Sequence, residues 1–338
     1  RFGVDASFLQ NSLTVTFDYF HKRTNDILMK PLISSVFGTE MPMANIGKMQ
    51  NQGWDLSVNY RLKTGAFTHN FNFNLGDSWN KVLEFPGDEQ ITQVEELSRI
   101  IRVGVPLNSY YGYKMAGFFQ SYDEIEASAI PVGAKVQPGD IKFVDRNDDG
   151  IIDSKDKFIL GNAFPRYTFG FTYGLNWKGI DFSMFWQGVG KRDMMLRGEL
   201  IEPYHANYSY TIYKHQLDFW TPTNTEARWP RLAAPGSDSN RNNYGNGNGS
   251  DLFLLDGKYL RLKNLTIGYT LPKEWTKHLG MQKARLYING QNLLTFSNNS
   301  FIDPESSEFD SKMSTSGANS GRSYPTLRYF GFGVDIEF

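Results

Sequence analysis

The clearest feature of this chain is a strict alternation of apolar and polar positions at its C-terminal end. Successive side chains of a β-strand point to opposite faces, so the alternation predicts a strand with one apolar face and one face of polar or small residues. Eight residue steps of about 3.3 Å, tilted by about 45°, span roughly 19 Å, which is most of the apolar band of a transmembrane β-barrel. The apolar positions are Phe330, Phe332, Val334, Ile336 and Phe338.

The same period of two residues recurs along the rest of the chain and predicts further strands. Helical periodicity is nearly absent: the best short helix is 272–279, and the acidic stretch 123–129 adds at most one helical turn. The fold class is therefore expected to be all-β. The alternating segments are 2–8, 13–19, 54–62, 67–75, 167–177, 180–186, 265–271 and 284–288.

Short and long connections alternate between these segments. Outer-membrane barrels place short turns at one end and long external loops at the other. We therefore expect about nine strands of a transmembrane antiparallel β-barrel with long extracellular loops. The β-like pieces 110–120 and 140–145 are expected to lie outside its wall. The short connections are 10–11, 63–66, 178–179 and 272–282, and the long ones are 30–46, 85–165, 191–257 and 295–325.

Nine strands do not close a bacterial barrel, because single-chain barrels there have even strand numbers. An open sheet edge is not tolerated in lipid, since its backbone groups would lack hydrogen-bond partners. We therefore expect residues 1–338 to be the C-terminal part of a larger barrel, whose other strands lie upstream of Arg1. The absence of a signal peptide agrees with this expectation.

Composition narrows the class of protein further. Aromatic residues make up 15% of the chain, which is typical of a barrel with interfacial girdles. The formal net charge of -1 gives no support for nucleic-acid binding, and the absence of cysteine excludes disulfides and thiolate chemistry. No apolar run approaches the roughly 18 residues of a membrane helix.

An acidic loop carries the sharpest local motif. Ca²⁺ prefers six to eight oxygen ligands, and a twelve-residue loop supplies them at positions 1, 3, 5, 7, 9 and 12, with glycine at position 6 for the sharp turn. Gly150 stands at that sixth position, whereas position 12 holds Asp where an EF-hand has Glu. The alternative is an Asx-rich turn with solvated carboxylates. The expected calcium ligands are Asp145, Asn147, Asp149, the Ile151 carbonyl, Asp153 and Asp156.

Aromatic residues gather in two of the long connections. Flat aromatic faces beside polar groups suit sugars or peptides, but the same residues could instead pack the long loops against each other or against a partner. The glycine-rich run 245–250 favours a flexible tip over a phosphate site. No nucleophile elbow or zinc-protease motif is present, and we expect no enzymatic activity. The candidate substrate or lid contacts are Tyr110, Tyr111, Tyr113, Phe118, Tyr204, Tyr208, Trp220 and Trp229.

Four segments together resemble the SusC/RagA-type, TonB-dependent outer-membrane transporters. They cover nearly the whole chain in the order of that family. The segments are 45–47 with 51–55, 106–113 with 117–120, 138–143 continuing to 161–165, and 259–265.

The resemblance implies a 22-stranded barrel in the outer membrane of a Gram-negative, Bacteroidota-like bacterium. It also implies an N-terminal plug domain and a TonB-contacting segment, both outside this chain. A SusD-like surface lipoprotein would act as a lid, and the imported nutrient would be an oligosaccharide or a peptide. Within this family, Phe330 to Phe338 resembles the C-terminal signal that is read during membrane assembly.

Two other functions remain open at this point. Another plugged receptor or a passive porin would have similar strands. A soluble all-β protein that binds or hydrolyses carbohydrate is the alternative from a different class, and its extraction into buffer without detergent would distinguish it.

Overall fold

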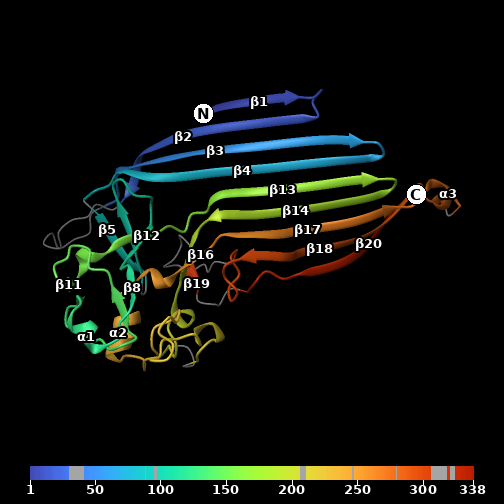
Figure 1. Cartoon of the computed structure of the whole chain (residues 1–338). Coiled ribbons are helices and arrows are strands. Elements are labelled where there is room, and N and C mark those ends of the chain that lie inside the picture. The colour runs from blue at the N-terminus through green and yellow to red at the C-terminus, as the bar shows by residue number, and fades with distance from the viewer. Residues whose placement is uncertain are drawn as a thin grey trace.

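The long strands of the chain form one sheet in the computed structural model (Figure 1). The structure describes residues 1–29, 42–87, 89–94, 97–205, 211–245, 247–278, 280–305, 318–319 and 324–338.

Nine antiparallel strands make up this sheet, which confirms the expected number. Their order is β1-β2-β3-β4-β13-β14-β17-β18-β20, so each strand pairs with the next wall strand along the chain. The strands are β1 (Phe2–Phe8), β2 (Leu13–Met29), β3 (Ala44–Thr64), β4 (Phe67–Glu84), β13 (Arg166–Trp177), β14 (Ile180–Lys191), β17 (Tyr259–Thr270), β18 (Lys283–Ser297) and β20 (Tyr329–Glu337).

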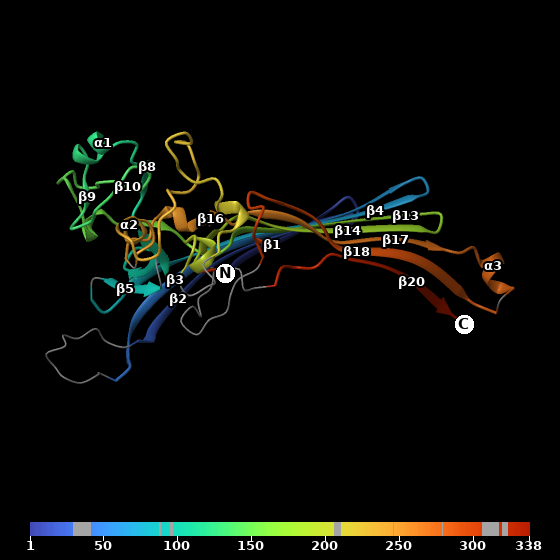
Figure 2. The same cartoon turned by 90° about the horizontal axis from the view of Figure 1, so that it is seen from below.

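The sheet is one curved layer that stays open (Figure 2). Within the described residues, β1 pairs only with β2, and β20 pairs only with β18. Both edges of the sheet are therefore unpaired in the part of the chain that the structure describes. Phe338 lies one residue beyond the end of β20.

Tight connections join the strands at one end of the sheet, where the C-terminus and the short helix α3 (Lys273–Lys277) also lie (Figure 1). Between β13 and β14, Lys178 and Gly179 have φ values of 44° and 87°. A positive φ at both central residues is the type I′ geometry, which matches the twist of a hairpin. None of the helices in the described ranges is long and apolar enough to cross a membrane.

The longest connection, residues 85–165, leaves the sheet after β4 and returns at β13, which pairs directly with β4. Its β-like pieces lie outside the nine-stranded sheet, as expected. Its elements are β5 (Glu89–Val94), β6 (Leu97–Arg102), β7 (Ser109–Gly112), β8 (Met115–Phe118), α1 (Tyr122–Glu126), β9 (Ile130–Pro131), β10 (Ile141–Phe143), β11 (Ile151–Ile152), η2 (Ser154–Asp156) and β12 (Phe158–Gly161).

The second large connection runs from 192 to 258, one residue later at each end than expected. The third runs from 298 to 328, because the alternation of Leu294 and Phe296 continues β18 to Ser297. Their elements are β15 (Asp193–Leu196), η3 (Gly198–Leu200), η4 (Lys214–Gln216), α2 (Asp238–Tyr244), η5 (Asp251–Phe253), β16 (Leu254–Asp256) and β19 (Ala318–Asn319).

The first two connections pack against each other and share their cores. We call the described residues of 85–165 and 192–258 the loop body; it lies at the end of the sheet opposite the C-terminus (Figure 1). One buried cluster joins Leu97 and Tyr110 of the first connection to Trp229 and Phe253 of the second. A second cluster joins Ile141 and Phe143 to Trp220.

The glycine-rich run 245–250 is packed, so the expectation of a flexible tip was wrong for its described residues. The amide of Tyr113 donates to the Gly249 carbonyl at 2.9 Å, and Ser250 is fully buried. A Cβ on Gly112 would lie 2.3 Å from the Gly249 carbonyl oxygen. The run directly follows α2, whose N-cap is Ser237.

We predict that Trp229→Ala loosens the loop body. The indole is fully buried and its Nε1 donates to the His215 carbonyl at 2.7 Å, so truncation leaves a cavity and an unpaired carbonyl. Such a change costs about 3–5 kcal/mol. Limited proteolysis of the full-length protein should show faster cleavage within 192–258.

The matched control is Trp275→Ala in α3, where the side chain is 62% exposed. It should leave the cleavage rate unchanged. Equal cleavage of both variants would contradict the assignment of Trp229 to the core.

Candidate functional site

The sheet has two chemically different faces. Along one registered row, Val15, Val58, Phe73, Phe171 and Trp186 lie side by side across five strands. The neighbouring row, which points to the other face, holds Thr16, Ser57, Asn74, Gly170 and Gln187 in the same five strands. We call these the apolar face and the polar face.

The apolar face continues to the edge strand β20. Its exposed side chains there are the five that define the terminal alternation, and Phe332 is 88% exposed. Ile288 of β18 stands beside Phe332, and Leu286 beside Val334, so the apolar surface is continuous across the pair. A surface of this kind requires a non-aqueous environment or a covering partner.

A hollow of about 850 Å³ lies where β4 parts from β13, and residues of the loop body complete it. Arg166 forms a bidentate ion pair with Asp77 and lies over the Trp79 ring at 5.2 Å. Asn162 and Leu107 of the loop body both line the hollow, and Asn162 donates from Nδ2 to the Leu107 carbonyl at 3.1 Å. Wall and loop body thus form one polar and aromatic surface.

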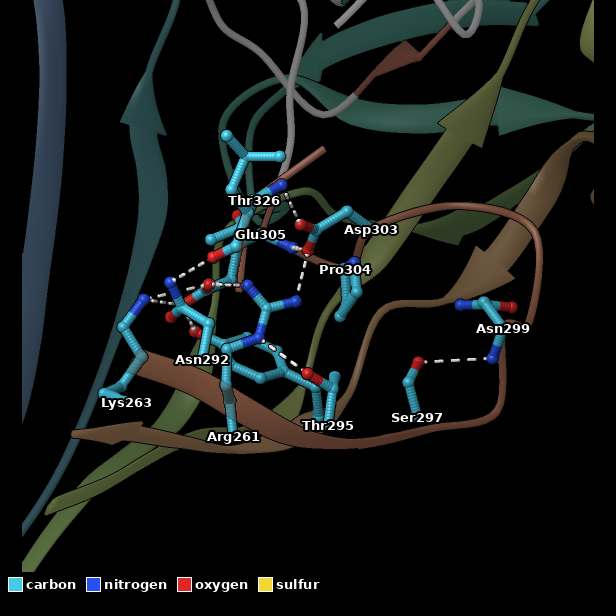
Figure 3. Close-up of polar contacts among 12 residues, drawn as sticks. Arg261, Lys263, Asn292, Thr295, Ser297, Asn299, Asp303, Pro304, Glu305 and Thr326 are labelled. Atoms are coloured by element: carbon cyan, nitrogen blue, oxygen red, sulfur yellow. Dashed lines mark hydrogen bonds and ion pairs between the residues drawn. The ribbon is translucent and has the colours of Figure 1, made fainter. Parts of the chain in front are cut away.

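An ion cluster fixes the third connection to the wall (Figure 3). Arg261 of β17 is 4% exposed, donates from Nη2 to Asp303 at 2.6 Å and pairs with Glu305. Its Nε donates to Thr295 Oγ1 at 2.9 Å. Lys263 adds a second cation, 3.1 Å from Glu305. These two cations and two carboxylates are largely shielded from solvent and neutralise one another. We call them the loop anchor.

The loop anchor holds both ends of the third connection. Asp303 follows β18, and its Oδ2 accepts from the amide of Thr326, which precedes β20, at 2.8 Å (Figure 3). Asn292 donates to the Leu327 carbonyl at 2.9 Å. Arg192 of the second connection donates to the Pro304 carbonyl at 3.1 Å. The departure and the return of this connection are thus fixed at one point of the wall.

The pKa of Asp303 reflects these contacts. Burial alone would raise the pKa of this carboxyl group, but the Arg261 guanidinium and the amides of Glu305 and Thr326 outweigh it. Together they lower the pKa to about 2 from its ordinary value of 3.8. Asp303 is therefore fully ionised at neutral pH.

The sequence did not reveal the loop anchor. Arg261 has the same parity as the apolar Leu265, so an unbroken alternation would place it on the apolar face. Lys263 is an extra residue in β17 relative to β14, and this bulge returns Arg261 to the polar face beside Gln187. The signal available in the sequence was the pair of charged residues Arg261 and Lys263, which stand at odd-numbered positions where the alternation predicts apolar residues.

A second buried polar cluster joins the two connections of the loop body. Asp140 is fully buried and accepts from the Ser239 hydroxyl at 2.8 Å and from Asn243 Nδ2 at 3.1 Å. Asn243 Oδ1 in turn accepts from the Ile141 amide at 2.8 Å. Burial raises the pKa of Asp140, although its three hydrogen-bond donors act in the opposite direction.

The acidic loop keeps several expected features of a cation site. Gly150 has a φ of 81°, as the sharp turn requires, and Asp145 Oδ1 is buried without a hydrogen-bond partner. Backbone amides donate hydrogen bonds to other carboxylate oxygens of this loop. The Gly150 amide donates to Asp145 Oδ2, and the Arg146 amide donates to Asp156. Among the described residues, no three acidic or histidine side chains converge closely enough to hold an ion. The calcium site therefore stays a prediction.

Most of the candidate contact aromatics are not available to a ligand. They lie in the cores that join the two connections, as the packing alternative requires, and Tyr110 and Trp229 are fully buried. Tyr204 is half-buried, and Tyr208 lies outside the described residues. The expectation of ligand contact is corrected for Tyr110, Tyr111, Tyr113, Phe118, Trp220 and Trp229, which are all at most 8% exposed.

We predict that Asp303→Asn loosens the third connection at neutral pH. The substitution keeps the side-chain size but removes one of the two carboxylates that neutralise the buried Arg261. Protease added to the folded full-length protein should cleave within 298–328 faster than in the unchanged protein. Glu84→Gln, which removes an exposed ion pair with Lys48, is the control and should have no effect.

The unchanged protein should show the matching pH dependence. Because the folded pKa of Asp303 is lowered, its ion pairs stabilise the loop base at all pH values above the ordinary pKa of 3.8 and lose that effect as pH falls toward about 2. Cleavage within 298–328 should therefore stay constant from pH 8 to about pH 5. A rise already between pH 7 and pH 6 would contradict the assignment.

Comparison with known proteins agrees with this architecture. Residues 2–293 match the family model described as "TonB dependent receptor-like, beta-barrel". TonB-dependent receptor P3 of Formosa agariphila is 32% identical over 348 residues, which cover 99% of this chain and 33% of that protein. TonB-dependent receptor SusC of Bacteroides thetaiotaomicron is 27% identical, over 99% of this chain and 31% of its own length.

The fold is also found in a solved structure. The structure of the RagAB peptide transporter superposes with a TM-score of 0.75 at 21% identity, covering 99% of this chain and 34% of that one. This chain spans about a third of the length of the proteins it matches. The named relatives are receptors, in agreement with the expectation that the chain is not an enzyme. The chain belongs to the TonB-dependent receptor-like β-barrel family and is of the SusC/RagA type.

Proposed function

We propose that the whole protein is an outer-membrane, TonB-dependent importer of a large hydrophilic nutrient. The observation that carries the proposal is the two-faced sheet. A lipid bilayer requires the continuous apolar face, and a water-filled lumen suits the amides and hydroxyls of the polar face. The exposed terminal strand, Phe330 to Phe338, would pair with the first strand of the complete barrel and serve as its assembly signal.

The position of the loop body indicates which end of the barrel would face the outside of the cell. All of its folded elements lie at one end of the sheet, and the tight turns lie at the other (Figure 1). In an outer-membrane barrel the long loops are extracellular, so 85–165, 191–257 and 295–325 would form the mouth. A loop body with its own cores offers a firm base on which a SusD-like lipoprotein lid can rest.

The plug and the TonB contact would lie outside this chain, which spans about a third of the length of the proteins it matches. A barrel of this size encloses a lumen too wide for side chains to fill, so a plug is required to close it. Energy delivered through TonB would move that plug. The residues described here would supply wall, mouth and lid contacts.

We also propose structural Ca²⁺ in the acidic loop. The unpartnered Oδ1 of Asp145 and the positive φ of Gly150 support it. Carboxylate and amide oxygens of this set suit a hard cation. The ion would be held by Asp145, Asn147, Asp149, the Ile151 carbonyl, Asp153 and Asp156, and it would hold the loop beside β9, with which β11 pairs.

Metal analysis of the full-length protein tests the calcium proposal. We expect close to one equivalent of calcium after purification in calcium-containing buffer. Asp149→Ala, which removes a loop carboxylate that is exposed and outside both cores, should lose the ion and expose 145–156 to protease. Asp123→Ala in α1 is the control. Absence of calcium, or an unchanged protease pattern in Asp149→Ala, would refute the proposal.

The transport proposal has its own experiment. The full-length protein, expressed as the only importer of its kind, should reach the outer membrane and take up a labelled pool of oligosaccharides or oligopeptides only while TonB is active. Its gel mobility should change on heating, as expected for a closed barrel. Extraction into buffer without detergent, or uptake that continues without TonB, would contradict it.

A further inference from the structure

The apolar face changes in chemistry where β2, β3 and β4 approach the loop body. Four successive rows of paired residues cross these strands there, and they pass from apolar through aromatic and polar to basic side chains. No register shift falls within these pairings, so the side chains point to one face. In that order, the rows are Phe17, Leu56 and Leu75; Tyr19, Trp54 and Asp77; His21, Gln52 and Trp79; Arg23, Gln50 and Lys81.

The last of these rows, which we call the basic row (Arg23, Gln50 and Lys81), holds two cations and no carboxylate. Arg23 and Lys81 are both exposed. Neither forms an ion pair with a carboxylate within the described ranges. Two strand spacings separate their Cα atoms, which is about 10 Å. An anionic group placed between them lies within reach of both long side chains.

The nearby carboxylates do not cancel this charge. Asp77, in the second row, is buried and held by its bidentate pair with Arg166. Beyond the basic row, Glu84 pairs with Lys48. Asp26 lies in the bulge of β2, also beyond the row. With all of these included, four cations stand against three carboxylates, and the surface keeps a net positive charge.

Hydrogen-bond donors face the same surface. The Tyr19 hydroxyl donates to Gln52 Oε1 at 3.0 Å, which uses the acceptor of that amide and leaves its two N–H groups as donors. The Arg23 guanidinium and the Lys81 ammonium are donors only. A phosphate group is negative and accepts hydrogen bonds through its oxygens, so it matches this set of donors.

The apolar rows indicate that the phosphate belongs to an amphiphile. Phe17 is 37% exposed and precedes Arg23 by six residues on the same face of β2, which is about 20 Å along the strand. One molecule can therefore place acyl chains on the apolar rows and a phosphate at the basic row. On the same face, β17 and β18 end with the apolar Leu260 and Phe296, so they do not continue the basic row.

We infer that the outward face of β2, β3 and β4 binds the phosphorylated headgroup of a glycolipid from the outer leaflet of the membrane, with Arg23 and Lys81 as the phosphate contacts. The inference rests on the proposed function, which places the loop-body end outside the cell. Phosphorylated glycolipid is the main lipid of that leaflet in an outer membrane. Because the site lies on the lipid-facing side of the wall, it is separate from any path through the lumen.

Lipid binding to the full-length protein tests the inference. The delipidated protein, in detergent, is titrated with lipid A that carries one phosphate and with the same lipid A after enzymatic removal of the phosphate. Native mass spectrometry measures the bound lipid. We expect the phosphorylated form to bind about tenfold more tightly. Arg23→Gln combined with Lys81→Gln should reduce this preference to about twofold or less.

A matched control removes the same charge from the other face. Lys22 and Lys63 are exposed and lie on the polar face of β2 and β3. Lys22→Gln combined with Lys63→Gln should therefore leave the preference within about twofold of its original value. Gel mobility with and without heating confirms that each variant is assembled. If the first double variant fails to assemble, Lys81→Gln alone should lower the preference by about threefold.

The other outcomes overturn the site in distinguishable ways. Equal binding of the two lipids, or equal loss of preference in both double variants, removes the phosphate contact. Equally tight binding of phosphatidylglycerol overturns the choice of a glycolipid. Competition by inorganic phosphate at the concentration of the lipid assigns the basic row to a free anion and overturns the lipid site.

Failure of the site can be told from failure of the proposed function. TonB-dependent uptake without a lipid preference overturns the site and leaves the importer in place. A lipid preference without any such uptake overturns the importer and supports the site, which requires only a lipid-facing wall. Extraction of the full-length protein into buffer without detergent overturns both.

Discussion

Register between strands is the constraint on which the rest of the structure depends. Side chains alternate with a period of two, so a slip of one residue in any pairing would exchange the apolar and polar faces of that strand. The pairing of β2 with β3 keeps Val15 beside Val58 and Thr16 beside Ser57, and each later pair continues the same rows. The two faces and the hollows on the polar face follow from this alignment.

The irregular positions of the sheet occur where the wall meets the loops. The bulge at Lys263 and the positive φ of Asn292 lie beside the loop anchor. Bulges turn side chains that regular pairing would place elsewhere, and they are frequent at the rims of barrels. Here the bulge brings a guanidinium to the two carboxylates that hold the third connection, so the irregularity has a specific effect on the position of a loop.

Sequence patterning predicted the sheet because one periodic signal governs every wall strand. The strand number, the open edge at β20 and the excursion between β4 and β13 all follow from alternation and loop length. The packing of the loop body was harder to predict, because its contacts join residues far apart in sequence. Trp220 and Gln120, which hydrogen-bond at 3.1 Å, are 100 residues apart, and nothing local marks them as neighbours. Aromatic clustering was therefore compatible with ligand contact until the burial was known.

The Asp140 cluster has a consequence for how such proteins can diversify. Asp140 and Ile141 come from one connection, and Ser239 and Asn243 come from another that starts two wall strands later. The loop body is thus a single folded module that is inserted into the wall in two pieces. Exchange of either piece alone between relatives would separate a buried carboxylate from its donors. Recombination that preserves a working rim must therefore transfer both pieces together, with β13 and β14 between them.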